Sequence, residues 1–149
     1  MKMREILFRG KRIDNGEWVE GAFLNDRDGA FYICPAVSDI SYGDGGNRRR
    51  IGCWYKVDPS TVGQFTGLTD KNGKRIFEGD IVRFAERRIG GEDVSIVEQV
   101  GFDEGGFCTN RYFLNNWLRN GIYGITKLEG IEVIGNIHDN PELLEAPDA

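Results

Sequence analysis

The stretch GLTDKNGKRIFEGDIVRF, residues 67–84, places two turn signals on either side of a short apolar run, and it decides the fold class. DKNG at 70–73 has the composition of a hairpin turn, because Gly73 can take the left-handed φ that such turns need. RIF at 75–77 offers apolar side chains to a core, and Gly79-Asp80 turns the chain into β-favouring residues. The stretch therefore predicts a hairpin followed by another strand, as in a small barrel.

The same stretch begins like a calcium-binding loop, so its ligand positions need checking. Counting from Asp70, Arg75 stands where the loop requires glycine, and Ile81 stands where it requires a bidentate glutamate. The match fails at its most demanding positions. We therefore predict that the stretch is architectural and holds no metal.

The whole chain fits a single all-β domain. It has 149 residues, which is enough for one core, and its 21 glycines suit tight turns better than helices. Apolar runs of strand length recur between turn signals, which predicts a meander of eight to ten short strands. Asn140, Pro141 and Glu142 predict a very short helix near the C-terminus, with Asn140 as its cap.

Other segments extend this pattern. Residues 4–24 read as a hairpin with its turn at 14–16, and Pro35 is expected to confine the strand before it to a sheet edge or a bulge. DEGG at 103–106 predicts another hairpin turn. FLNNWLRNG at 113–121 has the spacing of one helical turn.

Cysteine usage and the N-terminus indicate a cytosolic protein. Cys34, Cys53 and Cys108 are odd in number and lack a Cys-x-x-Cys spacing, so we expect free, buried thiols. The first ten residues carry no apolar run typical of a signal peptide, and no stretch approaches the roughly 20 apolar residues of a membrane helix.

The sequence offers no clear catalytic constellation. His138 is the only histidine, and no serine lies in a nucleophile-elbow pattern. We therefore expect neither catalytic residues, nor a cofactor, nor a metal. One alternative stays open, a small-molecule enzyme in which Glu98, Asp103 and Glu104 meet other acids across a barrel mouth.

Charge is distributed unevenly along the chain. Residues 47–88 hold ten Lys and Arg against five Asp and Glu, a net charge of +5, so the remainder carries −10 in a chain of net charge −5. This asymmetry fits a nucleic-acid surface, attraction between copies of the chain, or simple solvation. Arg48 to Arg50 precede Trp54 and Tyr55, which could stack on bases. The candidate nucleic-acid-binding residues are Arg48, Arg49, Arg50, Lys74, Arg75, Arg83, Arg87 and Arg88.

Three segments together resemble the YopX family of phage and prophage proteins. They are MREILFRG at 3–10, TVGQFTGLTDKNGKRIFEGDIV at 61–82 and IEVIGNIHDNPELLE at 131–145, whereas residues 25–52 carry no resemblance. The resemblance implies a mostly β protein with a small SH3-like barrel in its C-terminal part, and a homo-oligomer. It implies no reaction and no catalytic residues.

These observations lead to a first hypothesis and two alternatives. The first is a non-enzymatic β-rich binding or assembly module that associates with itself, folded as one compact unit with possible subdomains at 1–58 and 59–145. The alternatives are a nucleic-acid-binding protein that uses the basic segment 47–88, and the small-molecule enzyme. A membrane partner is not expected.

Overall fold

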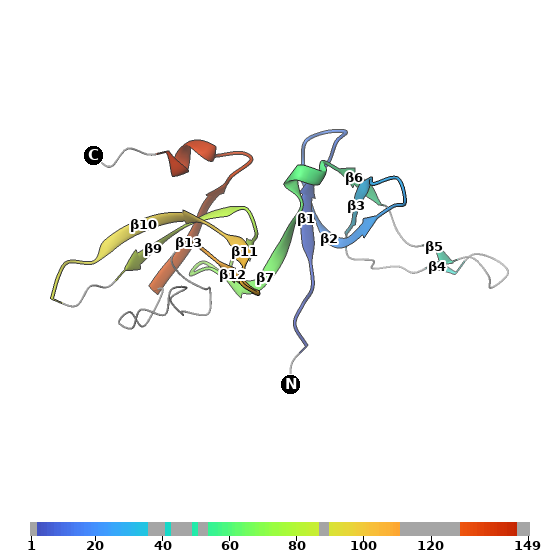
Figure 1. The fold of residues 1–149 in the computed structure, drawn as a ribbon. Helices are drawn as coiled ribbons and strands as arrows, with labels where there is room; N and C mark the ends of the chain where they lie inside the picture. Colours follow the sequence, from blue (N-terminus) through green and yellow to red (C-terminus); the bar gives the residue numbers. More distant parts are fainter. Residues whose placement is uncertain are drawn as a thin grey trace. The chain divides into compact units, whose positions relative to one another are not determined.

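The computed structural model describes residues 3–35, 41–42, 49–50, 54–86, 90–110 and 129–145, with the backbone alone for 41–42, 49–50 and 129. The strand pairs in this part of the chain are antiparallel, and its helices are two short 3-10 turns, so the predicted all-β class is confirmed (Figure 1). The chain divides into two compact units, Met1–Phe65 (unit 1) and Thr66–Ala149 (unit 2). The subdomain boundary expected at 58/59 stays a prediction.

Unit 1 carries the strands from β1 to β6 and the start of β7. Their bounds are β1 Phe8–Lys11, β2 Trp18–Asn25, β3 Phe31–Cys34, β4 Ser41–Tyr42, β5 Arg49–Arg50, β6 Tyr55–Val57, the 3-10 helix η1 Pro59–Thr61, and β7 Gly63–Thr69. The predicted N-terminal hairpin is confirmed as β1 and β2, with Gly16 in its turn at φ 71°.

The sheet of unit 1 closes on itself. Strands follow the order β6-β3-β2-β1, and the end of β1 returns to β6 because Asp58 N donates to Lys11 O and Ile13 N donates to Lys56 O. This closure is tight. An ideal Cβ on Gly21 would lie 1.8 Å from the carbonyl oxygen of Cys34, and one on Gly10 would lie 3.0 Å from Val57. At Gly21, where two backbones approach each other, only glycine fits, whereas at Gly10 the close neighbour is the Val57 side chain.

The expectation for Pro35 is wrong. β3 pairs with both β2 and β6 and is therefore an interior strand. It ends at Cys34, so the missing N–H of Pro35 falls outside the ladder and costs no strand hydrogen bond.

Unit 2 contains a three-stranded sheet and a separate hairpin. Its elements after β7 are β8 Arg75–Phe77, β9 Asp80–Glu86, β10 Val94–Gln99, β11 Gly101–Asp103, β12 Gly106–Cys108, β13 Glu129–Asn136 and the 3-10 helix η2 Pro141–Leu144. Among the described strands the sheet has the order β10-β9-β13, so β10 and β13 are its outer strands. β11 pairs with β12, which confirms the turn predicted at 103–106.

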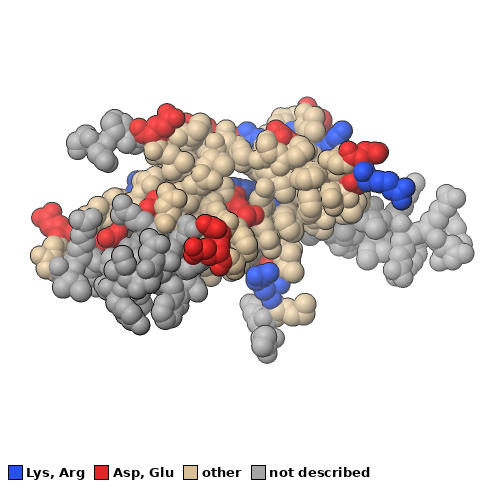
Figure 2. Space-filling view, in the orientation of Figure 1, with Lys and Arg blue, Asp and Glu red and all other residues tan. Residues whose placement is uncertain are grey.

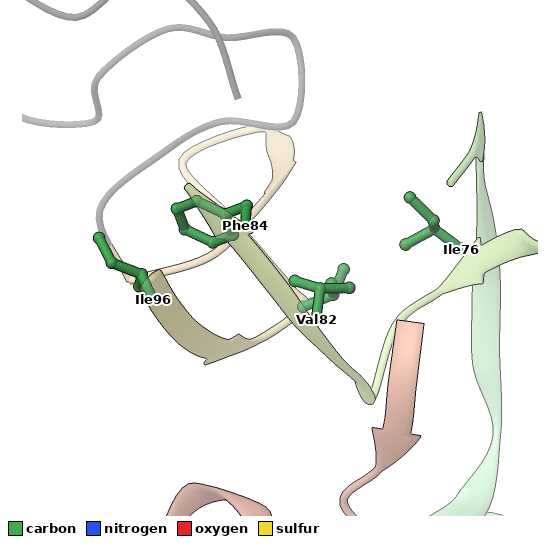
Figure 3. Close-up of a cluster of buried hydrophobic side chains, with 5 residues drawn as sticks. Ile76, Val82, Phe84 and Ile96 are labelled. Atoms are coloured by element: carbon green, nitrogen blue, oxygen red, sulfur yellow. The ribbon is translucent and has the colours of Figure 1, made fainter. Parts of the chain in front are cut away.

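The core of unit 2 forms around β9. Ile76, Val82, Phe84, Ile96 and Val100 form one buried cluster, and Figure 3 shows four of them labelled on β8, β9 and β10. Partly buried apolar side chains from β10, β12 and β13 pack against it. The alternation of buried and exposed residues along β10 follows from the two faces of a pleated strand.

The opening stretch folds as its sequence predicts. Gly73 and Gly79 both have positive φ, at 81° and 86°, and Ile76 and Phe77 are buried. The second turn is fixed by Asp80, whose Oδ2 accepts a hydrogen bond of 2.8 Å from Phe77 N.

The first turn attaches this hairpin to β13. Asp70 Oδ1 accepts from Asn72 N and Lys74 N at 2.8 and 2.9 Å, and Asp70 Oδ2 accepts from Val133 N at 3.0 Å. Lys71 N donates to Ile131 O at 2.9 Å. The turn therefore covers part of the edge of β13 that faces away from β9.

The C-terminal turn differs from its expectation in one detail. η2 begins at Pro141 as predicted, but the Asn140 side chain makes no cap hydrogen bond to it. Instead, Asn140 Oδ1 accepts from Asn136 N at 3.3 Å, beside Gly135. The helical turn predicted at 113–121 lies outside the described residues.

Replacing Gly21 with alanine should destabilise unit 1. The new Cβ would overlap the Cys34 carbonyl oxygen, so the sheet must shift, and we expect the free energy of unfolding to fall by about 1–3 kcal/mol or more. Urea unfolding of Gly21→Ala measures this. Gly101→Ala is the control, because nothing lies within 4 Å of its Cβ, and its effect should stay within about 0.5 kcal/mol. Equal effects of the two substitutions would contradict the close approach.

Replacing Asp70 with asparagine should destabilise unit 2 and reduce its sensitivity to acid. Burial raises the pKa of Asp70, but hydrogen bonds from Val133, Lys74 and Asn72 outweigh it and hold the pKa below 3.8. The ionised carboxylate thus adds stability that is present above about pH 4 and is lost as the pH falls through the folded-state pKa.

We expect Asp70→Asn to lower the free energy of unfolding by about 1–3 kcal/mol at neutral pH, measured by urea unfolding from pH 7 down to 3. Asp26→Asn is the matched control, because Asp26 also accepts two backbone N–H bonds within its own turn, while Tyr32 OH, which donates to it as well, lies only six residues away. An unchanged acid slope in Asp70→Asn would contradict the role given to this carboxylate.

Candidate functional site

A surface hollow of about 400 Å³ lies in unit 2, beside the β10 edge of the sheet. Four segments build it: the end of β10, the strand β11, the end of β12 with the two residues after it, and η2. The lining residues are Val97, Glu98, Gln99, Gly101, Phe102, Asp103, Cys108, Thr109, Asn110 and Leu144. Its volume falls in the range of small ligand sites and of pockets that accept a few side chains.

Exposed apolar side chains surround this hollow. Val97, Phe102 and Leu144 keep 37%, 56% and 42% of their surface exposed. The Phe102 ring is held by an edge-to-face contact with Phe107, at 5.2 Å between ring centroids. Apolar groups that three separate elements turn towards one hollow are typical of an interaction site.

The charged groups among the lining residues are both acidic. Glu98 is buried, and Asp103 is exposed at the end of β11. Cys108 and Thr109 are buried in the same lining. A site with this lining can pair with the charged end of a Lys or Arg side chain and pack against the aliphatic part of that side chain.

The sequence analysis grouped Glu98, Asp103 and Glu104, and the structure brings the first two into one lining. Glu104 is not among the lining residues and sits in the β11–β12 turn with φ 50°. The small-molecule enzyme hypothesis requires further acidic side chains to meet Glu98 and Asp103. Within the described ranges, no group of three or more His, Cys, Asp and Glu gathers as a metal site would.

The predicted basic residues lie on both units. Arg49 and Arg50 form β5 in unit 1, whereas Lys74 and Arg75 are exposed neighbours on the β7–β8 hairpin of unit 2. Arg83 lies on β9. The positions of Arg48, Arg87 and Arg88 fall outside the described residues.

Arg83 is paired with an acid that the sequence analysis did not single out. Arg83 Nη2 lies 3.0 Å from Glu132 Oε2, and Lys71 Nζ lies 3.3 Å from the same oxygen. Hydrogen bonds from Arg83 and then Lys71 lower the pKa of Glu132. The register Glu132↔Arg83 places opposite charges directly across two adjacent strands. This ion pair can be predicted only when the pairing of the two strands is known.

The remaining candidate side chains, those of His138 and the described cysteines, lie in a turn or in buried positions. His138 follows β13 in a turn, where its backbone N–H donates to Asn136 Oδ1 at 3.0 Å. Cys34 and Cys108 are free and buried, as expected, and Cys53 lies outside the described residues. In the part of the chain that the structure covers, no helix has the length and apolar character needed to cross a membrane.

Comparisons with known proteins identify a family and similar solved structures. A family model described as YopX protein matches residues 7–145. The crystal structure of protein EF1440 from Enterococcus faecalis is similar, with a TM-score of 0.59 and 29% sequence identity over 95% of this chain and 99% of that one. The search of curated proteins found no match.

Proposed function

The chain belongs to the YopX family, and on that premise we propose that it is a non-enzymatic, β-rich binding module that associates with copies of itself. The observation that carries this proposal is the hollow of unit 2 with its exposed Val97, Phe102 and Leu144. A cytosolic location and a phage or prophage origin belong to the same proposal. They rest on the odd number of cysteines without a Cys-x-x-Cys spacing and on the family resemblance.

Two features support a protein partner at this surface. Burying the exposed apolar groups would remove them from water, which is favourable by about 25 cal/mol per Å². The adjoining strand β10 is an edge of its sheet, and edge strands offer backbone groups on which another chain can align. That the C-terminal part forms an SH3-like barrel is also part of this proposal.

Self-association predicts a mass that depends on concentration. The monomer has a mass of 16.8 kDa. Sedimentation velocity and light scattering, on nuclease-treated protein from low to high micromolar concentration, should show species of higher mass. A strict monomer across the whole range would refute self-association.

The second candidate function is nucleic-acid binding, and one observation favours it. Lys74 and Arg75 are adjacent and exposed on one hairpin, and exposed basic residues are the groups that contact phosphates. Against it, Figure 2 shows the charged side chains of the described residues in small separate groups divided by uncharged surface on the face in view.

Nucleic-acid binding predicts a strong dependence on salt. Each phosphate contact should add about 0.7 to 0.9 to the slope of log K against log salt, so Lys74→Gln should reduce the slope by about one contact. Fluorescence anisotropy with single- and double-stranded DNA and RNA at low salt measures this. Arg27→Gln, at an exposed basic residue outside the segment 47–88, is the control. No binding at tens of micromolar would end this alternative.

A further inference from the structure

We propose that the β7–β8 hairpin of one copy seats in the unit 2 hollow of a second copy, with the basic residues Lys74 and Arg75 facing the acids Glu98 and Asp103. This inference rests on the self-association proposed above. It adds which two surfaces meet and what chemistry joins them.

The two surfaces lie at opposite edges of the same sheet. The hairpin turn is hydrogen-bonded to β13 through Lys71 N and Asp70 Oδ2, whereas the hollow begins at β10. β9 stands between these strands in the order β10-β9-β13. The turn of the hairpin is therefore fixed at the β13 edge of the sheet and the hollow lies at the β10 edge, so a hairpin from a second copy can enter the hollow without breaking either attachment.

The chemistry of the two surfaces is complementary. The hollow combines two carboxylates with exposed apolar groups and has no Lys or Arg among its lining residues. The hairpin combines exposed Lys74 and Arg75 with Leu68, which is also exposed. A basic side chain entering the hollow would place its charge near Asp103 and its aliphatic stem beside Phe102.

A contact between two different surfaces has a consequence for assembly. Each copy has one hairpin and one hollow, so every copy can donate to one neighbour and accept from another. Such a head-to-tail interface closes into a ring, of which a reciprocal two-fold dimer is the smallest, or continues as a filament. Because charge pairs contribute, association should weaken as salt rises.

Charge reversal on each surface tests this pairing. Asp103→Lys and Lys74→Glu should each raise the dissociation constant for self-association by about tenfold or more, because each places like charges across the interface. The double variant, Asp103→Lys with Lys74→Glu, should recover most of the wild-type affinity. Leu144→Ser tests the apolar part and should also weaken association.

The matched control reverses two exposed charges in unit 1. Asp28→Lys and Lys56→Glu lie outside both surfaces, so they should leave the association constant within about twofold, which is the scale of rim charges. Sedimentation velocity at two salt concentrations gives the constants for all variants. Urea unfolding shows that each variant retains the wild-type stability, and a destabilised one is replaced by Asp103→Asn or Lys74→Gln.

The outcomes separate the two levels of proposal. A monomeric wild type refutes the proposed function itself. A wild type that associates while Asp103→Lys and Lys74→Glu leave the constant unchanged refutes the hairpin-to-hollow contact alone. Weakening by each single reversal without recovery in the double variant also refutes the pairing, and recovery supports it.

Discussion

The carboxylate of Asp70 is the group on which unit 2 depends. It is buried, and an ionised carboxylate away from water is costly unless hydrogen bonds surround it. Two of its partners come from its own turn, and the third is Val133 N on the last strand. The same carboxylate therefore shapes the hairpin and positions the hairpin against β13. The architectural role of DKNG explains why these residues look like a ligand loop, since they bind the backbone of their own chain.

Much of the fold could be predicted because turn chemistry is local. Gly16, Gly73 and Gly79 have the positive φ that their sequence context suggests, and the strands between them follow. The predictions for Pro35 and Asn140 failed because each residue's role depends on the element next to it. β3 ends one residue before the proline, and Asn140 is engaged by the backbone of Asn136.

The candidate site was much less accessible to sequence analysis. Glu98 and Asp103 had been grouped by proximity along the chain, but Leu144 reaches the hollow from η2, and no local pattern reports such an approach. Charge counting has a similar limit. Arg83 adds to the basic total of residues 47–88, yet its guanidinium lies against Glu132 and is partly neutralised. Composition gives the sum of the charges, whereas strand register decides which of them face solvent.

The position of β13 also affects how the chain folds during synthesis. The strands that close unit 1 have all emerged once Asp58 has left the ribosome, so the backbone bonds between β1 and β6 need no later residue. Unit 2 must wait, because β9 lacks one of its two neighbours and Asp70 lacks its Val133 partner until the final strand leaves the ribosome. Vectorial synthesis therefore leaves the β9 edge and its apolar side chains open for the time needed to translate residues 87–136. During that interval, apolar side chains of β9 that the finished sheet covers are open to contact with other chains.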